Sequence, residues 1–309
     1  MLILTLKRLT SMILIMLVVS FILFALFESD KLEVAGKVLG PYSSHEQREI
    51  WLEKNGYNQP FLKRYVLWVY DAIRGDFGES IQLKVPVSQV LGQRLKNTGI
   101  LALGLFLLMV PISLTMGIFA GMKEGSFRDR AISVTAVVTT SVPEFAIATF
   151  LTAIFVFWLN WLPGTSAMSS GFDFKELVLP VGVLLIYDMG YVARMTRASM
   201  AEVMTSQYVR TAILKGIPYR RVIVKHALRN ALIAPFTVIM LQLNWLLSGV
   251  IVVEVFFAYK GFGSLLYDAA LFGDIYVIEA CTLVAVFVAV FSQFISDVGY
   301  TLLNPRIRF

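Results

Sequence analysis

The chain has 309 residues, of which 57% are hydrophobic and 13% aromatic, and its formal net charge is +6. This composition excludes an ordinary soluble globular domain, because the apolar runs are longer than a soluble core requires. The single cysteine excludes an intramolecular disulfide and a cysteine-based metal site. The positive charge does not indicate a nucleic-acid ligand, since it lies in short loops between apolar runs, where it sets membrane orientation.

Apolar stretches of membrane-spanning length dominate the sequence. A spanning helix needs about 20 mostly apolar residues. Six stretches qualify: 9–27, 97–122, 131–158, 177–193, 230–257 and 275–303. The sequence therefore predicts an all-α integral membrane protein with six transmembrane helices. A signal peptide is the alternative for the first stretch, but its apolar run is long and no small-residue cleavage site follows it.

Lysine and arginine residues are divided unevenly between the two sides of these spans. The N-terminus, the loop 123–130, the segment 194–229 and the C-terminus together hold 15 of the 27, against three acids. The positive-inside rule places this set in the cytoplasm. We therefore predict a multi-pass protein of a bacterial or archaeal cytoplasmic membrane, with both termini cytoplasmic.

The long segment 28–96 is predicted to lie outside the cytoplasm. Ser43-Ser44-His45-Glu46 precedes a charged run, which is typical of a capped helix start. Apolar residues recur at helical spacing over 61–73. The chain thus divides into a first span (1–27), a small extracytoplasmic helical segment (28–96) and a five-helix transmembrane core (97–309).

The segment 199–229, which we name the basic hairpin, is too polar to span a membrane. It predicts a first helix over about 199–215, a stop at Gly216 and a second helix that opens at Pro218. One interpretation is a helix pair that docks on a soluble partner. The other is an orienting loop on anionic lipid. Physical reasoning alone favours neither.

Enzymatic motifs are missing from the sequence. It contains no GxxxxGK[ST] phosphate loop, no HExxH, no CxxC and no GxSxG. Two histidines and one cysteine make a dedicated metal site improbable. We therefore expect a non-catalytic chain that carries no cofactor or metal of its own.

Several patterns together resemble one family. Arg210-Thr211-Ala212, Gly216 and His226-Ala227-Leu228-Arg229 are similar to the EAA loop of ABC importer permeases, in the form usual for the oligopeptide, dipeptide and nickel branch. Residues 193–197 and 220–221 belong to the same pattern. Residues 58–60 and 74–80 resemble the extracytoplasmic segment of the first permease subunit, and 304–308 resemble the terminal Asp-Pro-Arg-Ile-Arg. The resemblance runs along the whole chain, in order.

The resemblance implies a permease subunit of a type I, ATP-driven importer for peptides or a related small solute, which forms half of the translocation pathway. Its implied partners are a second homologous permease subunit, two cytoplasmic ATPases that bind ATP and Mg, an extracytoplasmic solute-binding protein and the lipid bilayer. The basic hairpin would contain the helix that couples to an ATPase. The expected coupling residues are Gln207, Tyr208, Arg210, Thr211, Ala212, Lys215, Gly216, Ile217 and Pro218.

Two positions depart from the family pattern. Lys260-Gly261-Phe262-Gly263 stands where the family usually has Pro-Gly-x-Gly. Gly261 and Gly263, which would permit an extracytoplasmic re-entrant turn, are kept, whereas Lys260 replaces the proline that shapes the turn in the family. Asn304 replaces the usual aspartate, so an ion pair made by that acid is missing.

Acidic residues inside spans are costly and point to function. Glu144, Asp188 and Glu254 are candidates for the translocation pathway, and Glu144 follows Pro143, where a helix kinks. The alternative is a buried polar pair between spans, which we favour for Glu254 and for Asp297 with Arg306 or Arg308. An ion-driven carrier that uses Glu144 and Asp188, or a membrane receptor or scaffold, are the alternative functions.

Overall fold

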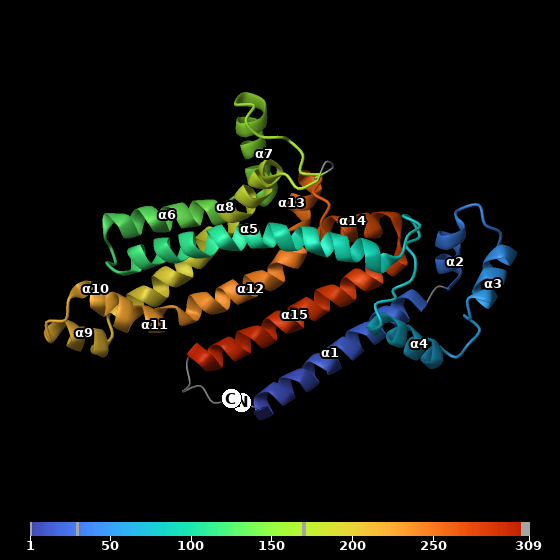
Figure 1. Cartoon of the computed structure of the whole chain (residues 1–309), viewed down its shortest axis with the longest axis horizontal. Coiled ribbons are helices and arrows are strands. Elements are labelled where there is room, and N and C mark those ends of the chain that lie inside the picture. The colour runs from blue at the N-terminus through green and yellow to red at the C-terminus, as the bar shows by residue number, and fades with distance from the viewer. Residues whose placement is uncertain (1, 29–30, 169–170, 304–309) are drawn as a thin grey trace. The chain divides into compact units, whose positions relative to one another are not determined.

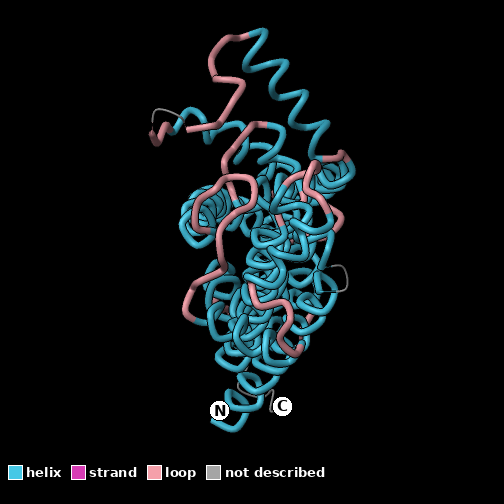
Figure 2. Tube along the Cα trace, turned by 90° about the vertical axis from the view of Figure 1, so that its right-hand side faces the viewer, coloured by secondary structure: helices cyan, strands magenta, loops and turns pink. Residues whose placement is uncertain are grey.

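The computed structural model describes residues 2–28, 31–168 and 171–303, which fold almost entirely into helices (Figures 1 and 2). In this part of the chain, the one strand-like feature is an isolated bridge between Glu79 and Pro86. Four helices are long and apolar enough to cross a membrane, and two bent helix pairs raise the number to six. The prediction of an all-α membrane protein is confirmed. The four long helices are α1 (Leu2–Glu28), α5 (Val87–Gly121), α8 (Phe174–Met204) and α15 (Ile275–Leu303).

The predicted third span is sharply bent rather than straight. Helix α6 (Phe127–Ser141) and the pair α7 (Glu144–Thr152) and η1 (Ala153–Trp158) meet at 97°, and Figure 1 shows α7 turning away from α6. Pro143 explains the break, because it cannot donate a helical hydrogen bond and forces the preceding residue out of the helical region. Val142 accordingly has an extended ψ of 127°.

The predicted fifth span also consists of several pieces. It is built from α11 (Leu228–Ala231), α12 (Ile233–Gly249) and α13 (Ile251–Phe256). The helical stretch that ends at Ala231 meets α12 at an angle of 48°. Two of the six predicted spans are therefore broken helices, and both breaks lie in the predicted five-helix core.

The segment that follows α1 is helical, as predicted, and folds into three short helices, the second and third of which lie where the sequence indicated. They are α2 (Lys31–Leu39), α3 (His45–Lys54) and α4 (Phe61–Ile73). Ser44 Oγ accepts the Gln47 N–H (3.2 Å), and Gln47 Oε1 accepts the Ser44 N–H (2.9 Å). This reciprocal pair is the expected capping box at the start of α3. Helix α4 packs on α1 through edge contacts of Phe61 and Tyr65 with Phe21.

The chain divides into two compact units, 1–98 with 261–291 and 99–260 with 292–309. In the first unit, the Phe262 N–H donates to Thr98 Oγ1 (2.7 Å), which fixes the start of α14 (Phe262–Phe272) against α5. In the second unit, α6, α7, α11 and α12 all pack against α8. The core around α8 contains Leu101, Met109, Val183, Leu184, Val192 and Val253, all fully buried.

Candidate functional site

The basic hairpin begins in the last turns of α8 and continues as a pair of helical limbs. The predicted first helix is wrong in its bounds: α8 continues to Met204, and α9 (Gln207–Leu214) begins after Ser206. The hydroxyls of Thr205 and Ser206 donate to the carbonyls of Glu202 (2.8 Å) and Val203 (2.6 Å). Such bonds compete with the helical ladder and explain the break.

The turn of the hairpin matches the prediction. Gly216 adopts a left-handed φ of +74°, which glycine accepts without a steric cost. The Ile217 N–H then donates to the Ala212 carbonyl (3.3 Å). Pro218 precedes the second limb, which consists of α10 (Tyr219–Arg221), η2 (Val222–Ala227) and α11. The two limbs therefore reverse the chain direction within four residues.

A small apolar core holds the two limbs together. Met200, Val209, Val222, Ala227 and Ala231 are fully buried in it. Among the nine residues expected to couple to an ATPase, Ala212 is buried in this core and Ile217 is half-buried. The other seven are exposed: Gln207, Tyr208, Arg210, Thr211, Lys215, Gly216 and Pro218. Ala212 thus supports the surface rather than forming part of it.

Sequence reasoning missed the apolar tip of the hairpin. Leu214 is 80% exposed, and Ile213 is 47% exposed. The cationic residues near this tip in the sequence are also exposed: Arg210, Lys215 and Arg220. For Leu214 the signal was present in the sequence, because Leu214 falls outside the helical spacing of the buried pair Val209 and Ala212. Ile213 follows Val209 by four positions, so spacing alone would have placed it on the buried face. An exposed apolar tip with surrounding cations suits a groove on a protein partner.

A cavity of about 200 Å³ lies between α6, α8 and α12 of the second unit. Asp188 on its wall is 2% exposed. Gln242 Nε2 donates to Asp188 Oδ1 (2.9 Å), whereas Oδ2 has no hydrogen-bond partner within the described chain. Tyr187 and Trp245 stack with ring centroids 5.6 Å apart. The lining residues are Thr140, Tyr187, Asp188, Tyr191, Arg194, Gln242 and Trp245.

Glu144 lies close to this cavity without lining it. It opens α7 directly after Pro143, at the bend predicted from the sequence. It interacts electrostatically with Asp188 and Tyr187. Its Oε2 atom is buried and has no hydrogen-bond partner among the described residues. The structure thus brings together two of the three acids proposed for the pathway, while their role in transport stays a prediction.

The third candidate acid occupies a different environment. Glu254 in α13 is fully buried and interacts electrostatically with Tyr259, and it does not line the Asp188 cavity. Gly261 is the residue before α14, and its N–H donates to Ser264 Oγ (3.1 Å). Gly263 is buried in the first turn of α14. The Asp297 side chain and residues 304–308 lie outside the described parts.

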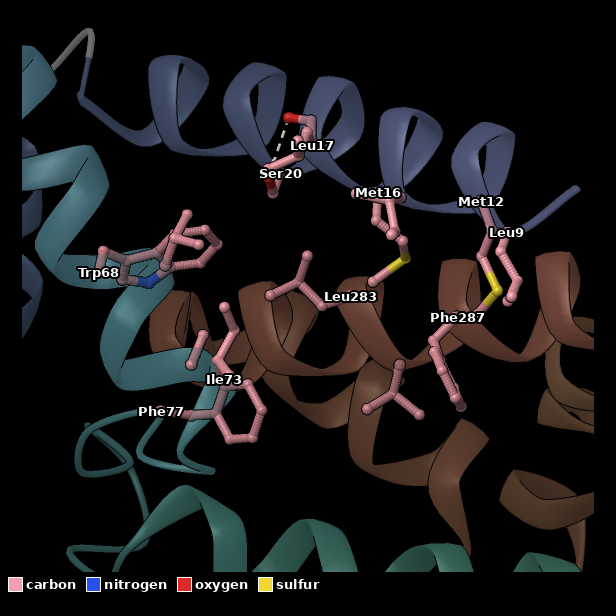
Figure 3. Close-up of a pocket in the computed structure, with 14 residues that line it drawn as sticks. Leu9, Met12, Met16, Leu17, Ser20, Trp68, Ile73, Phe77, Leu283 and Phe287 are labelled. Carbon is pink, nitrogen blue, oxygen red and sulfur yellow. Dashed lines mark hydrogen bonds between the residues drawn. The ribbon is translucent and has the colours of Figure 1, made fainter. Parts of the chain in front are cut away.

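The first unit contains a second cavity, of about 600 Å³, between α1, α4 and α15 (Figure 3). Met12, Met16, Trp68, Leu283 and Phe287 are among its lining residues. The hydroxyl of Ser20 is the one side-chain hydroxyl on this wall, and it donates to the Leu17 carbonyl (3.0 Å). A charged solute would find no ionic partner on these walls. The cavity therefore offers no site for a charged solute.

Known proteins are similar to this chain along its length. The sequence profile of the family described as "Binding-protein-dependent transport system inner membrane component" matches residues 113–309. A probable peptide ABC transporter permease of Sinorhizobium fredii is 33% identical over 308 residues, with 98% of each chain covered. The oligopeptide transport system permease AppB of Bacillus subtilis is 32% identical over 299 residues, with 94% of each covered. The glutathione transport system permease GsiC of Escherichia coli is 32% identical over 303 residues, with 98% of each covered.

Proposed function

Because the chain belongs to the family of binding-protein-dependent transport system inner membrane components, we propose that its basic hairpin couples a peptide pathway to an ATPase. The chain is a multi-pass permease subunit of an ABC importer for peptides. Permeases of this family are non-catalytic membrane subunits. ATP and Mg would accordingly be bound by partner chains.

The exposed tip of the basic hairpin carries the coupling proposal. Its two limbs share one apolar core. Because a packed core is not easily compressed, a displacement of α9 should move the whole hairpin. One limb continues from α8, and the other leads through α11 into α12. Both α8 and α12 line the Asp188 cavity. A movement of the hairpin would therefore reach both helices that form the cavity wall.

The proposed assembly has two permease halves. This chain pairs with a second homologous permease subunit, and each half docks on one ATPase. An extracytoplasmic solute-binding protein delivers the solute, which agrees with the name of the family. The basic hairpin and both termini face the cytoplasm, as the distribution of lysine and arginine indicates.

In the proposed cycle, closure of the ATPases moves the hairpin, and the attached helices change between inward-facing and outward-facing states. The bent pairs at α6–α7 and α11–α12 are where such a change is easiest, because their helical hydrogen bonds are already interrupted. Glu144 lies at the α6–α7 break and interacts electrostatically with Asp188, and both would line the pathway of the solute.

Co-purification and transport test the proposal directly. A variant that lacks residues 207–218 should insert into the membrane but should lose the ATPases during purification and lose ATP-dependent peptide uptake. As a control, the double variant Arg128→Gln and Arg130→Gln removes two exposed charges from the start of α6, on the same predicted side of the membrane. It should retain both the ATPases and peptide uptake. Normal uptake by the deletion variant would contradict the coupling role.

The ion-driven carrier is not favoured, because the relatives are named as permeases of ABC transport systems. The same applies to a receptor or scaffold. Uptake that persists without ATP and follows an imposed ion gradient would nevertheless overturn the importer.

A further inference from the structure

Two opposite charges on the wall of the Asp188 cavity have no ionic partner in the described chain. Asp188 is 2% exposed, and its Oδ2 atom accepts no hydrogen bond there. Arg194 is exposed on the same wall and forms no ion pair with a described residue. An acid kept only to join two spans would have both oxygens satisfied, because an unsatisfied buried acceptor is costly. The free oxygen and the free guanidinium therefore point to a ligand with both signs of charge.

The spacing of these two residues sets the size of that ligand. Arg194 follows Asp188 by six residues on α8, which corresponds to a rise of about 9 Å along the helix axis. An extended peptide advances about 3.3–3.6 Å per residue. The ammonium and carboxylate groups of a peptide of roughly three residues are therefore separated by a comparable distance.

The rest of the wall suits the same ligand. The stacked rings of Tyr187 and Trp245 offer flat apolar surfaces that contact side chains without selecting among them, and such surfaces also attract an ammonium group. Glu144 adds a second carboxyl group near Asp188. Arg194, at the other end of the wall, is the one cationic side chain among the described lining residues. The charge gradient along α8 thus favours one direction of the peptide.

We propose that this cavity binds the two charged ends of a short peptide during translocation, with Asp188 on the α-ammonium and Arg194 on the α-carboxylate. The inference rests on the proposed function and adds the substrate class, free zwitterionic peptides of about three residues. Because only the two charged ends are recognised, the site would bind peptides regardless of their side chains. Only two charge contacts would hold the solute, and one of them, at exposed Arg194, faces solvent, so the solute can be released, as a conducting pathway requires.

Equilibrium binding to the purified importer complex, without its solute-binding protein, tests the proposal. The probes are tri-alanine, N-acetyl-tri-alanine and tri-alanine amide. Asp188→Asn should weaken binding of tri-alanine roughly tenfold, as expected for the loss of one charge-assisted contact. It should leave the affinity for the N-acetylated peptide unchanged. Arg194→Gln should weaken binding of tri-alanine to a similar degree and leave the affinity for the amide unchanged.

Two controls keep the result unambiguous. Asp71→Asn and Arg130→Gln remove an exposed acid and an exposed base elsewhere and should change none of the three affinities. If Asp188→Asn does not assemble, the affinities of the wild-type complex for the three peptides still test the proposal. Equal wild-type affinity for tri-alanine and its N-acetyl form, or no measurable binding of tri-alanine, would overturn the proposal.

ATP-dependent uptake of tri-alanine into proteoliposomes separates this proposal from the proposed function. Uptake by the wild-type complex, combined with an equal loss of affinity for all three peptides in Asp188→Asn, overturns the end-recognition site alone. Absence of ATP-dependent uptake of any peptide overturns the importer function itself.

Discussion

Arg197 on α8 holds the Asp129 carboxylate of α6 at two points: Nε donates to Oδ1 (2.9 Å), and Nη2 donates to Oδ2 (2.8 Å). The Asp129 side chain is 5% exposed. The Gly125 N–H (2.9 Å) and the Ser133 hydroxyl (3.2 Å) also donate to it. This parallel, charge-assisted geometry is the strongest form of ion pair that side chains make. It fixes the end of α8 that leads into the basic hairpin to the start of α6.

Removal of Arg197 should cost more stability than removal of Asp129. Arg197→Met leaves an almost fully buried carboxylate without its cation, and we expect a loss of about 3 kcal/mol. Asp129→Asn leaves Arg197 partly exposed and still paired with Glu124 (3.2 Å), so its loss should be smaller. The thermal midpoint of the purified complex measures both. A larger decrease of the thermal midpoint in Asp129→Asn than in Arg197→Met would contradict this prediction. It would show that the unpaired buried carboxylate is not the main source of the destabilisation.

Gly117 and Gly121 should not tolerate even alanine. A Cβ at Gly117 would lie 2.3 Å from Thr196 Cβ, and one at Gly121 would lie 2.6 Å from the Arg197 carbonyl. These glycines form a GxxxG pattern on α5, which lets two helices approach closely. We expect each alanine variant to lose about 1–3 kcal/mol.

The matched control for these variants lies in the same helix. A Cβ at Gly99 would meet nothing within 4 Å. Gly99→Ala should therefore be neutral or raise stability by up to about 1 kcal/mol, because alanine favours the helix. Thermal midpoints of the three single variants, measured in one detergent, make the comparison. Equal effects at Gly99 and Gly117 would rule out close packing as the cause.

Local signals in the sequence predicted local structure correctly. The capping box at Ser44, the stripe over α4, the kink at Pro143 and the turn at Gly216 all depend on residues within four positions of one another. Such features need no knowledge of the fold.

Relations between distant residues could not be predicted in the same way. Asp129 and Arg197 are 68 positions apart, and both are ordinary loop-end charges in the sequence. Asp188 was predicted as a pathway residue, but its hydrogen-bond partner could not be predicted, because Gln242 lies in another span 54 positions later. The GxxxG pattern on α5 was readable in the sequence but does not say which helix packs there. Identifying a partner requires the tertiary structure.

Two variants in the basic hairpin should separate effects on stability from effects on coupling to the ATPase. Leu214→Ser changes an exposed side chain and should leave the thermal midpoint unchanged, but it should reduce ATP-dependent uptake several-fold by removing an apolar contact with the ATPase. Val209→Ala lies in the hairpin core and should lower stability by about 2 kcal/mol. Unchanged uptake in Leu214→Ser would exclude the apolar tip from the coupling surface.

Ser80 and Asp274 join the segment before α5 to the start of α15. The Ser80 hydroxyl (2.5 Å) and the Gln82 N–H (3.1 Å) both donate to Asp274 Oδ2, and Asp274 is 2% exposed. Ser80→Ala removes one donor from a buried carboxylate, and we expect a loss of about 1–3 kcal/mol. Hydrogen exchange of residues 78–86 should accelerate, while exchange in the basic hairpin stays unchanged. Faster exchange across the whole chain would instead indicate global destabilisation and would contradict a local role for this bond.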